Sequence, residues 1–234
     1  MNSSNNNSNN VLENLNLLNP NSPFMKVCTF IWNLLVLDLI FLLCCIPVFT
    51  IGAASTAMYT VIFDKENESS QVGRFFRAFI ANFKTSTKAW LVCMVVFGVL
   101  AVDLLWLNNL EIFGQAVFRF IIWGFIIYAF AAQMYLFPLL SKYDAPLKNT
   151  LKNSMLLCLG FFPSTLVMLI INLAPVLLFF MNIELFFRGL PLIVMFWFAI
   201  TAHLDAIMLR SIFRKVENAN EEAEEEQAAL PDKT

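Results

Sequence analysis

The sequence predicts an all-α, polytopic membrane protein with six transmembrane helices, or five as the alternative, and amphipathic helices at the membrane surface. Of its 234 residues, 59% are hydrophobic and 14% are charged, whereas a soluble domain carries about 45–50% apolar and about 25% charged residues. Several apolar runs reach the length of about 20 residues that crosses a hydrocarbon core. These observations exclude a soluble enzyme, a disordered protein and a nucleic-acid-binding protein.

Both ends of the chain are polar and frame one membrane domain. Residues 1–24 are rich in Asn and Ser and are predicted to be a disordered leader. Residues 25–215 are predicted to form a single helical membrane domain. After Val216 the chain holds seven acidic residues and one basic residue, Lys233, so residues 216–234 are predicted to be a disordered acidic tail.

The first apolar run, residues 25–63, is too long for one span. As a single helix it would measure about 58 Å, against about 30 Å for the hydrocarbon core. Pro47 and Gly52 mark a break, and Thr50 is a candidate cap for the helix that follows. We expect a hairpin of helices over 25–46 and 52–63. One span with a re-entrant continuation is the alternative.

Residues 72–88 show helical periodicity, with Val72, Phe75, Phe76, Phe79, Ile80 and Phe83 on one face. Basic residues lie largely off that face: Arg74, Arg77, Lys84 and Lys88. This pattern predicts a helix that lies on the surface of the lipid bilayer, with its bases toward anionic headgroups.

Four more spans are expected over residues 89–107, 115–140, about 153–181 and 190–212. Prolines interrupt the third of these, and residues 182–189 are expected to be a loop. Bases concentrate in 64–88, in 141–152 and after residue 209, so the positive-inside rule puts these segments in the cytoplasm. With six spans, both termini are then cytoplasmic.

One set of residues resembles the YesL family of bacterial membrane proteins, whose function is unknown. The set comprises Asn33, the segment Pro47, Thr50, Gly52, Ala53, Ala54, Thr56, Ala57 and Tyr59, then Phe75, Phe76 and Phe79, and finally Asn82, Phe83 and Lys84. The resemblance is good over residues 25–90. It implies a protein of the bacterial cytoplasmic (inner) membrane whose partner is a sugar importer or another membrane protein.

From the resemblance and the lack of catalytic motifs we expect a non-enzymatic accessory or interaction subunit, associated with carbohydrate uptake and needing no cofactor. The sequence contains no P-loop, no H-E-x-x-H and no G-x-S-x-G motif. No metal or disulfide pattern connects its five cysteines. A small transporter or channel is the alternative function.

Ionisable residues at membrane depth are candidates for a functional site. In the six-span arrangement Asp38, Asp103 and Arg119 fall in the outer half and form a candidate polar cluster, with a candidate ion pair between Asp103 and Arg119. Asp205 also lies in an apolar run, where a packing role is the simpler interpretation. Asn33 and Asn172 are expected to form interhelical hydrogen bonds.

Overall fold

The computed structural model describes residues 23–64, 70–108 and 114–229, and every element in these ranges is a helix. The elements are α2 (Pro23–Cys45), the 3-10 helix η2 (Val48–Thr50), α3 (Ile51–Phe63), α4 (Gln71–Asn108), α5 (Gln115–Lys142), α6 (Leu147–Gly160), α7 (Phe162–Met181) and α8 (Ile183–Ala229). Five of them, α2, α4, α5, α7 and α8, contain stretches long and apolar enough to cross a membrane. The predicted all-α, multi-pass membrane fold is therefore confirmed. Most of the predicted leader lies outside the described residues.

The helix α3 is too short to cross a bilayer unaided. Its 13 residues rise about 20 Å, against a hydrocarbon core of about 30 Å. It lies inside the bundle instead, in contact with α2, α4, α5 and α8, and most of its residues are buried. The second helix of the predicted six-span arrangement is thus present. By length and composition, however, five helices of the described structure can cross a membrane.

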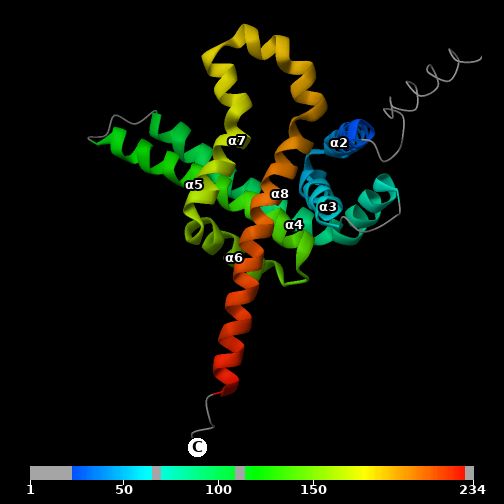
Figure 1. Cartoon of the computed structure of the whole chain (residues 1–234). Helices are drawn as coiled ribbons and strands as arrows, with labels where there is room; N and C mark the ends of the chain where they lie inside the picture. Colours follow the sequence, from blue (N-terminus) through cyan, green and yellow to red (C-terminus); the bar gives the residue numbers. More distant parts are fainter. Residues whose placement is uncertain (1–22, 65–69, 109–113, 230–234) are drawn as a thin grey trace, which may run out of the picture.

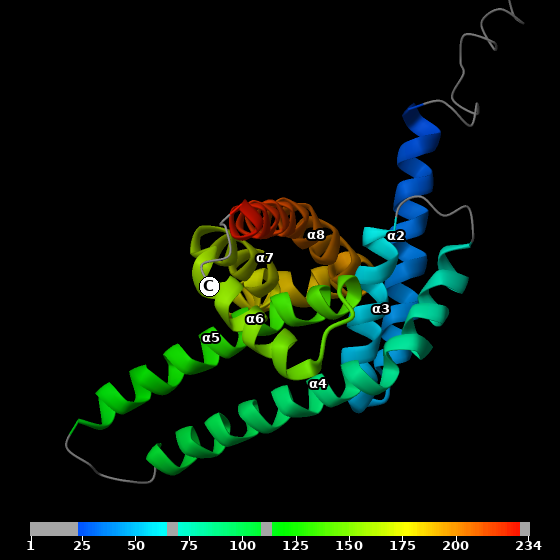
Figure 2. The same ribbon diagram turned by 90° about the horizontal axis from the view of Figure 1, so that it is seen from below.

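The long helices form two hairpins that project in different directions from the shared core. In Figure 1, α7 and the first part of α8 form one hairpin, and α4 and α5 form the other. Figure 2 shows α2 and α3 side by side, far from the last part of α4 and the first part of α5. The core gathers around Leu37, Phe75, Tyr135, Leu136 and Leu209.

The predicted surface helix over 72–88 is the first part of α4 rather than a separate element. No Gly or Pro interrupts residues 74–97, so the backbone hydrogen bonds continue from one predicted segment into the next, although α4 changes direction along its length (Figure 2). The phenylalanine row is divided between two environments. Phe75 is fully buried in the core, whereas Val72, Phe76 and Ile80 are exposed.

The span predicted to end at Met181 is two helices, α6 and α7, separated at Phe161. Phe161 leaves the helical conformation, with φ −112° and ψ 45°. Pro163 lies in the first turn of α7, where a residue without an N–H costs no hydrogen bond. The same residue in a continuous helix would remove a backbone bond and clash with the preceding turn.

The expected loop 182–189 is wrong, because α8 begins at Ile183. Asn182 Oδ1 accepts a hydrogen bond of 3.0 Å from Leu185 N, which is the geometry of a helix N-cap. Glu184 supports the first turn through its ion pair with Arg188, four residues on. The Asn-x-Glu signal was present in the sequence, but the surrounding polarity suggested a loop.

The predicted disordered tail also differs from the structure, because α8 continues to Ala229. Residues 216–229 contain no Gly or Pro and are rich in Glu and Ala, which are favourable helix formers. A helix already started and packed by its apolar part needs no new nucleus to extend into this segment.

The turn between α2 and α3 depends on Thr50, though not as the predicted side-chain cap. Its Oγ1 lies 2.5 Å from Cys44 O and 2.6 Å from Pro47 O. The hydroxyl therefore lies within hydrogen-bond distance of one carbonyl in the last turn of α2, Cys44 O, which has no partner within that helix, and of Pro47 O in the turn that follows.

Close contact between α3 and α4 requires a glycine at position 52. A Cβ added to Gly52 would lie 2.6 Å from the backbone oxygen of Ser86 and 2.6 Å from Trp90 Cβ. Neither atom is the end of a flexible side chain, so any larger residue must push the helices apart. Trp90 Nε1 also donates to Val48 O at 2.8 Å, which ties α4 to η2.

We predict that Gly52→Ala lowers the free energy of unfolding by about 1–3 kcal/mol, the usual effect of overpacking. Thermal unfolding in detergent measures the change. Gly98→Ala is the matched control, since Gly98 is also in a helix and no atom lies within 4 Å of the position that an alanine Cβ would take there. An unchanged midpoint for Gly52→Ala would show that α3 and α4 can separate freely.

Candidate functional site

The residues of the predicted family motif mostly pack α3 into the bundle. Ala53, Ala54 and Ala57 are completely buried. Ser86 Oγ donates to Thr56 Oγ1 at 2.8 Å, across the α3–α4 contact. Of the whole set, Thr50, Gly52, Ala53, Ala54, Thr56, Ala57, Tyr59 and Phe75 are buried, Phe79, Asn82 and Phe83 are half-buried, and Asn33, Pro47, Phe76 and Lys84 are exposed. The motif is therefore chiefly a packing motif, and Tyr59 is its one member that enters a buried polar site.

The predicted polar cluster of Asp38, Asp103 and Arg119 is not assembled. Asp103, near the end of α4, and Arg119, near the start of α5, are exposed. The α4–α5 hairpin projects away from α2 (Figures 1 and 2). Among the described residues no ion pair joins these two side chains. Asp38 is fully buried, and its Oδ1 accepts a hydrogen bond of 3.2 Å from Ala199 N in α8. The prediction failed because the sequence indicates which helices form a hairpin but not how each helix is rotated about its axis. It therefore does not reveal which side chains face each other.

The basic residues assigned to the lipid surface have different environments. Arg77, Lys84 and Lys88 are exposed, as expected. Arg74 is instead directed to the end of α3, where its guanidinium donates to Asp64 O and lies 4.0 Å from the Asp64 carboxylate. Arg74 thus holds the α3–α4 connection rather than offering a free charge.

A carboxylate, an amide and a phenol meet in the centre of the bundle. Asp205 of α8 is 1% exposed. Its Oδ2 accepts hydrogen bonds from Asn172 Nδ2 of α7 at 2.8 Å and from the Tyr59 hydroxyl of α3 at 3.4 Å. The predicted interhelical hydrogen bond of Asn172 is confirmed. Three helices that are distant in sequence are therefore joined at one carboxylate oxygen.

The second oxygen of this carboxylate is unsatisfied. Among the described residues, Asp205 Oδ1 has no hydrogen-bond partner although it is inaccessible to solvent, and the same is true of Gln133 Oε1 in α5. A buried polar atom without a partner costs about 1–3 kcal/mol, and more if it is charged. Such an atom in a natural bundle calls for a ligand, an ion or a water molecule.

Asp205 and Gln133 line the same cavity, which has a volume of about 260 Å³ and lies between α3, α5, α7 and α8. Its polar lining consists of Ser55, Tyr59, Gln133, Asn172, Thr201 and Asp205, and its aromatic lining consists of Phe41, Phe130, Phe137, Trp197 and Phe198 with the Tyr59 ring. No Lys, Arg or His lines it among the described residues. We call this the Asp205 cavity.

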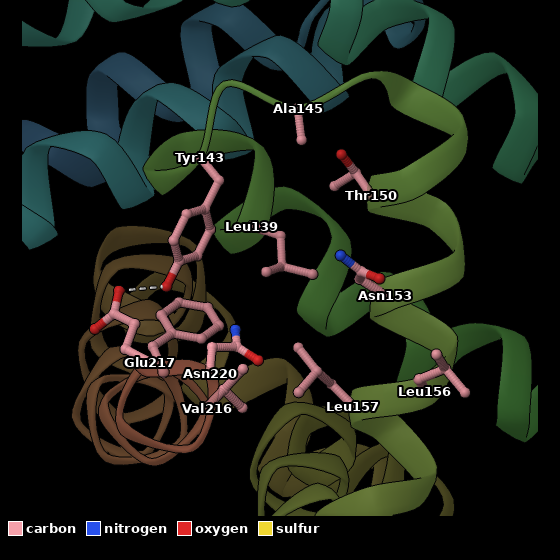
Figure 3. Close-up of a pocket in the computed structure, with 11 residues that line it drawn as sticks. Leu139, Tyr143, Ala145, Thr150, Asn153, Leu156, Leu157, Val216, Glu217 and Asn220 are labelled. Carbon is pink, nitrogen blue, oxygen red and sulfur yellow. Dashed lines mark hydrogen bonds between the residues drawn. The ribbon is translucent and has the colours of Figure 1, made fainter. Parts of the chain in front are cut away.

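A larger groove of about 550 Å³ lies between the end of α5, α6 and the distal part of α8 (Figure 3). Glu217 accepts hydrogen bonds there from the Tyr143 hydroxyl at 2.7 Å and from Lys142 Nζ at 2.8 Å. Burial and the adjacent Glu217 carboxylate raise the pKa of Tyr143, which keeps its hydroxyl protonated as the donor. Its amides, Asn153 and Asn220, are exposed, so the described part of this groove leaves no buried polar group unpaired.

Neither site has the ligands of a protein-bound transition metal. No group of three or more His, Cys, Asp or Glu side chains within the described ranges is arranged to hold a metal ion. The Asp205 cavity offers one carboxylate and neutral oxygen atoms, a set that suits hydrogen-bond donors and single positive charges.

A comparison with known protein families matches the part of the chain in which most of the motif residues lie. Residues 34–104 match the model of a family described as a protein of unknown function, DUF624. This match is consistent with the resemblance to the YesL family, and it covers α3 together with most of α2 and α4. No curated protein and no solved structure matches the chain.

We predict that Asn172 and Asp205 are energetically coupled. Asn172→Leu should lower the free energy of unfolding by about 1–3 kcal/mol, because it leaves Asp205 Oδ2 short of its closest donor. Asp205→Leu should also destabilise, since Asn172 and Tyr59 lose their acceptor. The double variant should lose less free energy of unfolding than the sum of the two single losses. Thermal unfolding of the four proteins in one detergent checks this, and strict additivity would contradict the coupling.

Proposed function

We propose that the protein is a non-enzymatic, solute-binding membrane protein of the small-transporter type, with the Asp205 cavity as its binding site. The observation that carries the proposal is the unpartnered Oδ1 of a fully buried carboxylate that lines a cavity in the bundle. This is the alternative function that the sequence left open. Its site, however, differs from the predicted Asp103 and Arg119.

A purely structural role explains only one of the two carboxylate oxygens of Asp205. The hydrogen bonds from Asn172 and Tyr59 both end on Oδ2, and they would fix the three helices equally well if the residue were a neutral acceptor. A carboxylate in the apolar part of a membrane protein is expensive, and such residues typically mark ion or substrate sites. An unsatisfied oxygen is the feature that a bound solute explains and packing does not.

An accessory role near a carbohydrate importer is the second candidate. It is supported by surfaces that suit protein partners: exposed apolar side chains along the α4–α5 and α7–α8 hairpins, and the acidic end of α8, which extends beyond the bundle (Figure 1). The association with carbohydrate uptake rests on the family resemblance.

The proposed location is the bacterial cytoplasmic membrane, with both termini in the cytoplasm. The concentration of bases in 64–88, 141–152 and 210–215 supports this orientation of the loops. The chain reverses at η2, and α3 runs back beside α2 (Figure 2), which supports an N-terminus on the same side as those bases.

We predict that cysteines in the Asp205 cavity react with a water-soluble thiol reagent. In a variant whose native cysteines are replaced, Ser55→Cys and Thr201→Cys should be labelled by a methanethiosulfonate that carries an ammonium group, because both positions line the cavity. Mass spectrometry of the intact protein measures the labelling. Thr165→Cys is the control, since Thr165 is as buried as Thr201 and does not line the cavity.

If neither cavity position reacts, the cavity is closed to water. That result would remove the solute-binding proposal and leave the accessory role.

We predict that reporters fused to the two ends of the chain both report a cytoplasmic location. The physical reason is the positive-inside rule together with the chain reversal at η2. Paired fusions, one active only in the cytoplasm and one active only outside it, make the measurement. An N-terminus outside would mean that α2 crosses the membrane while α3 remains a re-entrant helix, which gives five spans.

A further inference from the structure

We infer that the ligand of the Asp205 cavity is a small protonated amine, a primary or secondary ammonium. This inference rests on the proposed solute-binding function and names the chemical class of its ligand. It is argued from the charge, the hydrogen-bond acceptors, the aromatic lining and the size of the cavity.

The charge of the cavity selects a cation. Asp205 is the only ionisable carboxylate among its described lining residues, and none of them is basic. Two bases of α8 lie close to Asp205 in sequence, His203 and Arg210, and neither lines the cavity. His203 Nδ1 donates to Ala199 O at 2.8 Å. The Arg210 guanidinium donates to Ile62 O at 2.5 Å and lies over the Phe63 ring. An anionic ligand would meet an unscreened negative charge in a low dielectric, whereas a cation would offset it.

The unpaired atoms select a ligand with N–H groups. Asp205 Oδ1 and Gln133 Oε1 are both acceptors, both buried, and both without a partner in the described structure. A primary ammonium carries three donors and no acceptor. Its donors match acceptors of this kind, whereas a quaternary ammonium has no N–H group to offer.

The aromatic side chains favour an organic cation over a neutral solute. Six rings line the cavity, including Tyr59 and Trp197. The faces of aromatic rings attract ammonium groups, and the attraction grows when the cation is desolvated. The same rings provide apolar contact for an alkyl chain.

The volume excludes a bare metal ion as a good fit and limits the size of the amine. About 260 Å³ corresponds to the bulk volume of eight or nine water molecules, at about 30 Å³ each. A monovalent metal ion would leave most of this space to water. An ammonium with a short alkyl chain occupies more of it and leaves less to water.

The test is calorimetric titration of the detergent-solubilised full chain with n-butylammonium chloride, and with 1-butanol as its neutral isostere. Butylammonium should bind at least about tenfold more tightly than 1-butanol, because hydrogen bonds to charged groups are stronger than those between neutral groups. Tetramethylammonium should bind more weakly than butylammonium, since it has no N–H group. Trp197, which lines the cavity, provides a second readout through ligand-dependent quenching that a Trp197→Phe variant should lose.

Two variants locate the binding. Asp205→Asn should weaken the binding of butylammonium by about tenfold or more. Asp38→Asn is the matched control, because Asp38 is an equally buried carboxylate with one unpartnered oxygen that does not line the cavity, and it should leave the affinity unchanged. If Asp205→Asn fails to fold, the comparison of butylammonium with 1-butanol on the unmodified protein still decides the inference.

Equal binding of butylammonium and 1-butanol, or full affinity in Asp205→Asn, would overturn the inference. Binding of a neutral polyol such as glucose that Asp205→Asn abolishes would also overturn it, while leaving the proposed solute-binding function intact. Failure of the proposed solute-binding function would be seen in a different experiment. In that case, cysteines placed in the cavity would not react with the water-soluble reagent.

Discussion

The structure depends on keeping a helix that is too short to cross the membrane away from lipid. α3 ends at Phe63, and backbone groups at a helix end that faced lipid would find no hydrogen-bond partner there. Small residues solve the problem by letting neighbouring helices approach closely, as α4 does at Gly52. Arg210 of α8 and Arg74 of α4 then donate to carbonyl groups at the end of α3 and beyond it, Ile62 O and Asp64 O. The surrounding helices thus supply both the packing and the hydrogen bonds that water would otherwise provide.

The same arrangement brings the carboxylate of Asp205 into the bundle and provides hydrogen-bond donors to only one of its two oxygens. Tyr59 can reach Asp205 only because α3 is embedded next to α8, and Asn172 reaches it from α7. An ion in an apolar medium is costly unless it is paired and hydrogen-bonded. Two donors to one oxygen lower this cost without removing it, because the other oxygen has no partner among the described residues. Asp38 shows the contrast: it too has one unpartnered oxygen, but it does not line the Asp205 cavity and is bonded to the backbone of α8.

The sequence was sufficient for the fold class and for most helices, because long apolar runs have few alternatives in physical terms. It was insufficient where a boundary depended on one cap or on continuity, as at Asn182 and in the acidic end of α8. For the site, composition identified Asp205 and Asn172 as unusual, but periodicity along one helix cannot reveal which residues of other helices face them. Asp103 and Arg119 were preferred because they are adjacent in a hairpin, whereas the contacts of Asp205 span 33 and 146 residues of sequence. Gln133 carried no signal beyond a single amide within an apolar run.

The match to a family of unknown function covers residues 34–104, and this boundary divides the site. Tyr59 lies inside it, on the helix whose small residues set the close packing, so the matched segment supplies the frame and one hydrogen-bond donor. Gln133, Asn172 and Asp205 lie outside it, and they supply the amide, the carboxylate and the unpaired acceptors that determine which ligand fits. A protein that shared only the matched segment would inherit the embedded helix and its tyrosine without the negative charge of the cavity. The packing of this bundle and its ligand chemistry are therefore encoded in different parts of the chain. The contacts of α3 with α5 and α8, of α4 with α5 and of α2 with α8 bring them together.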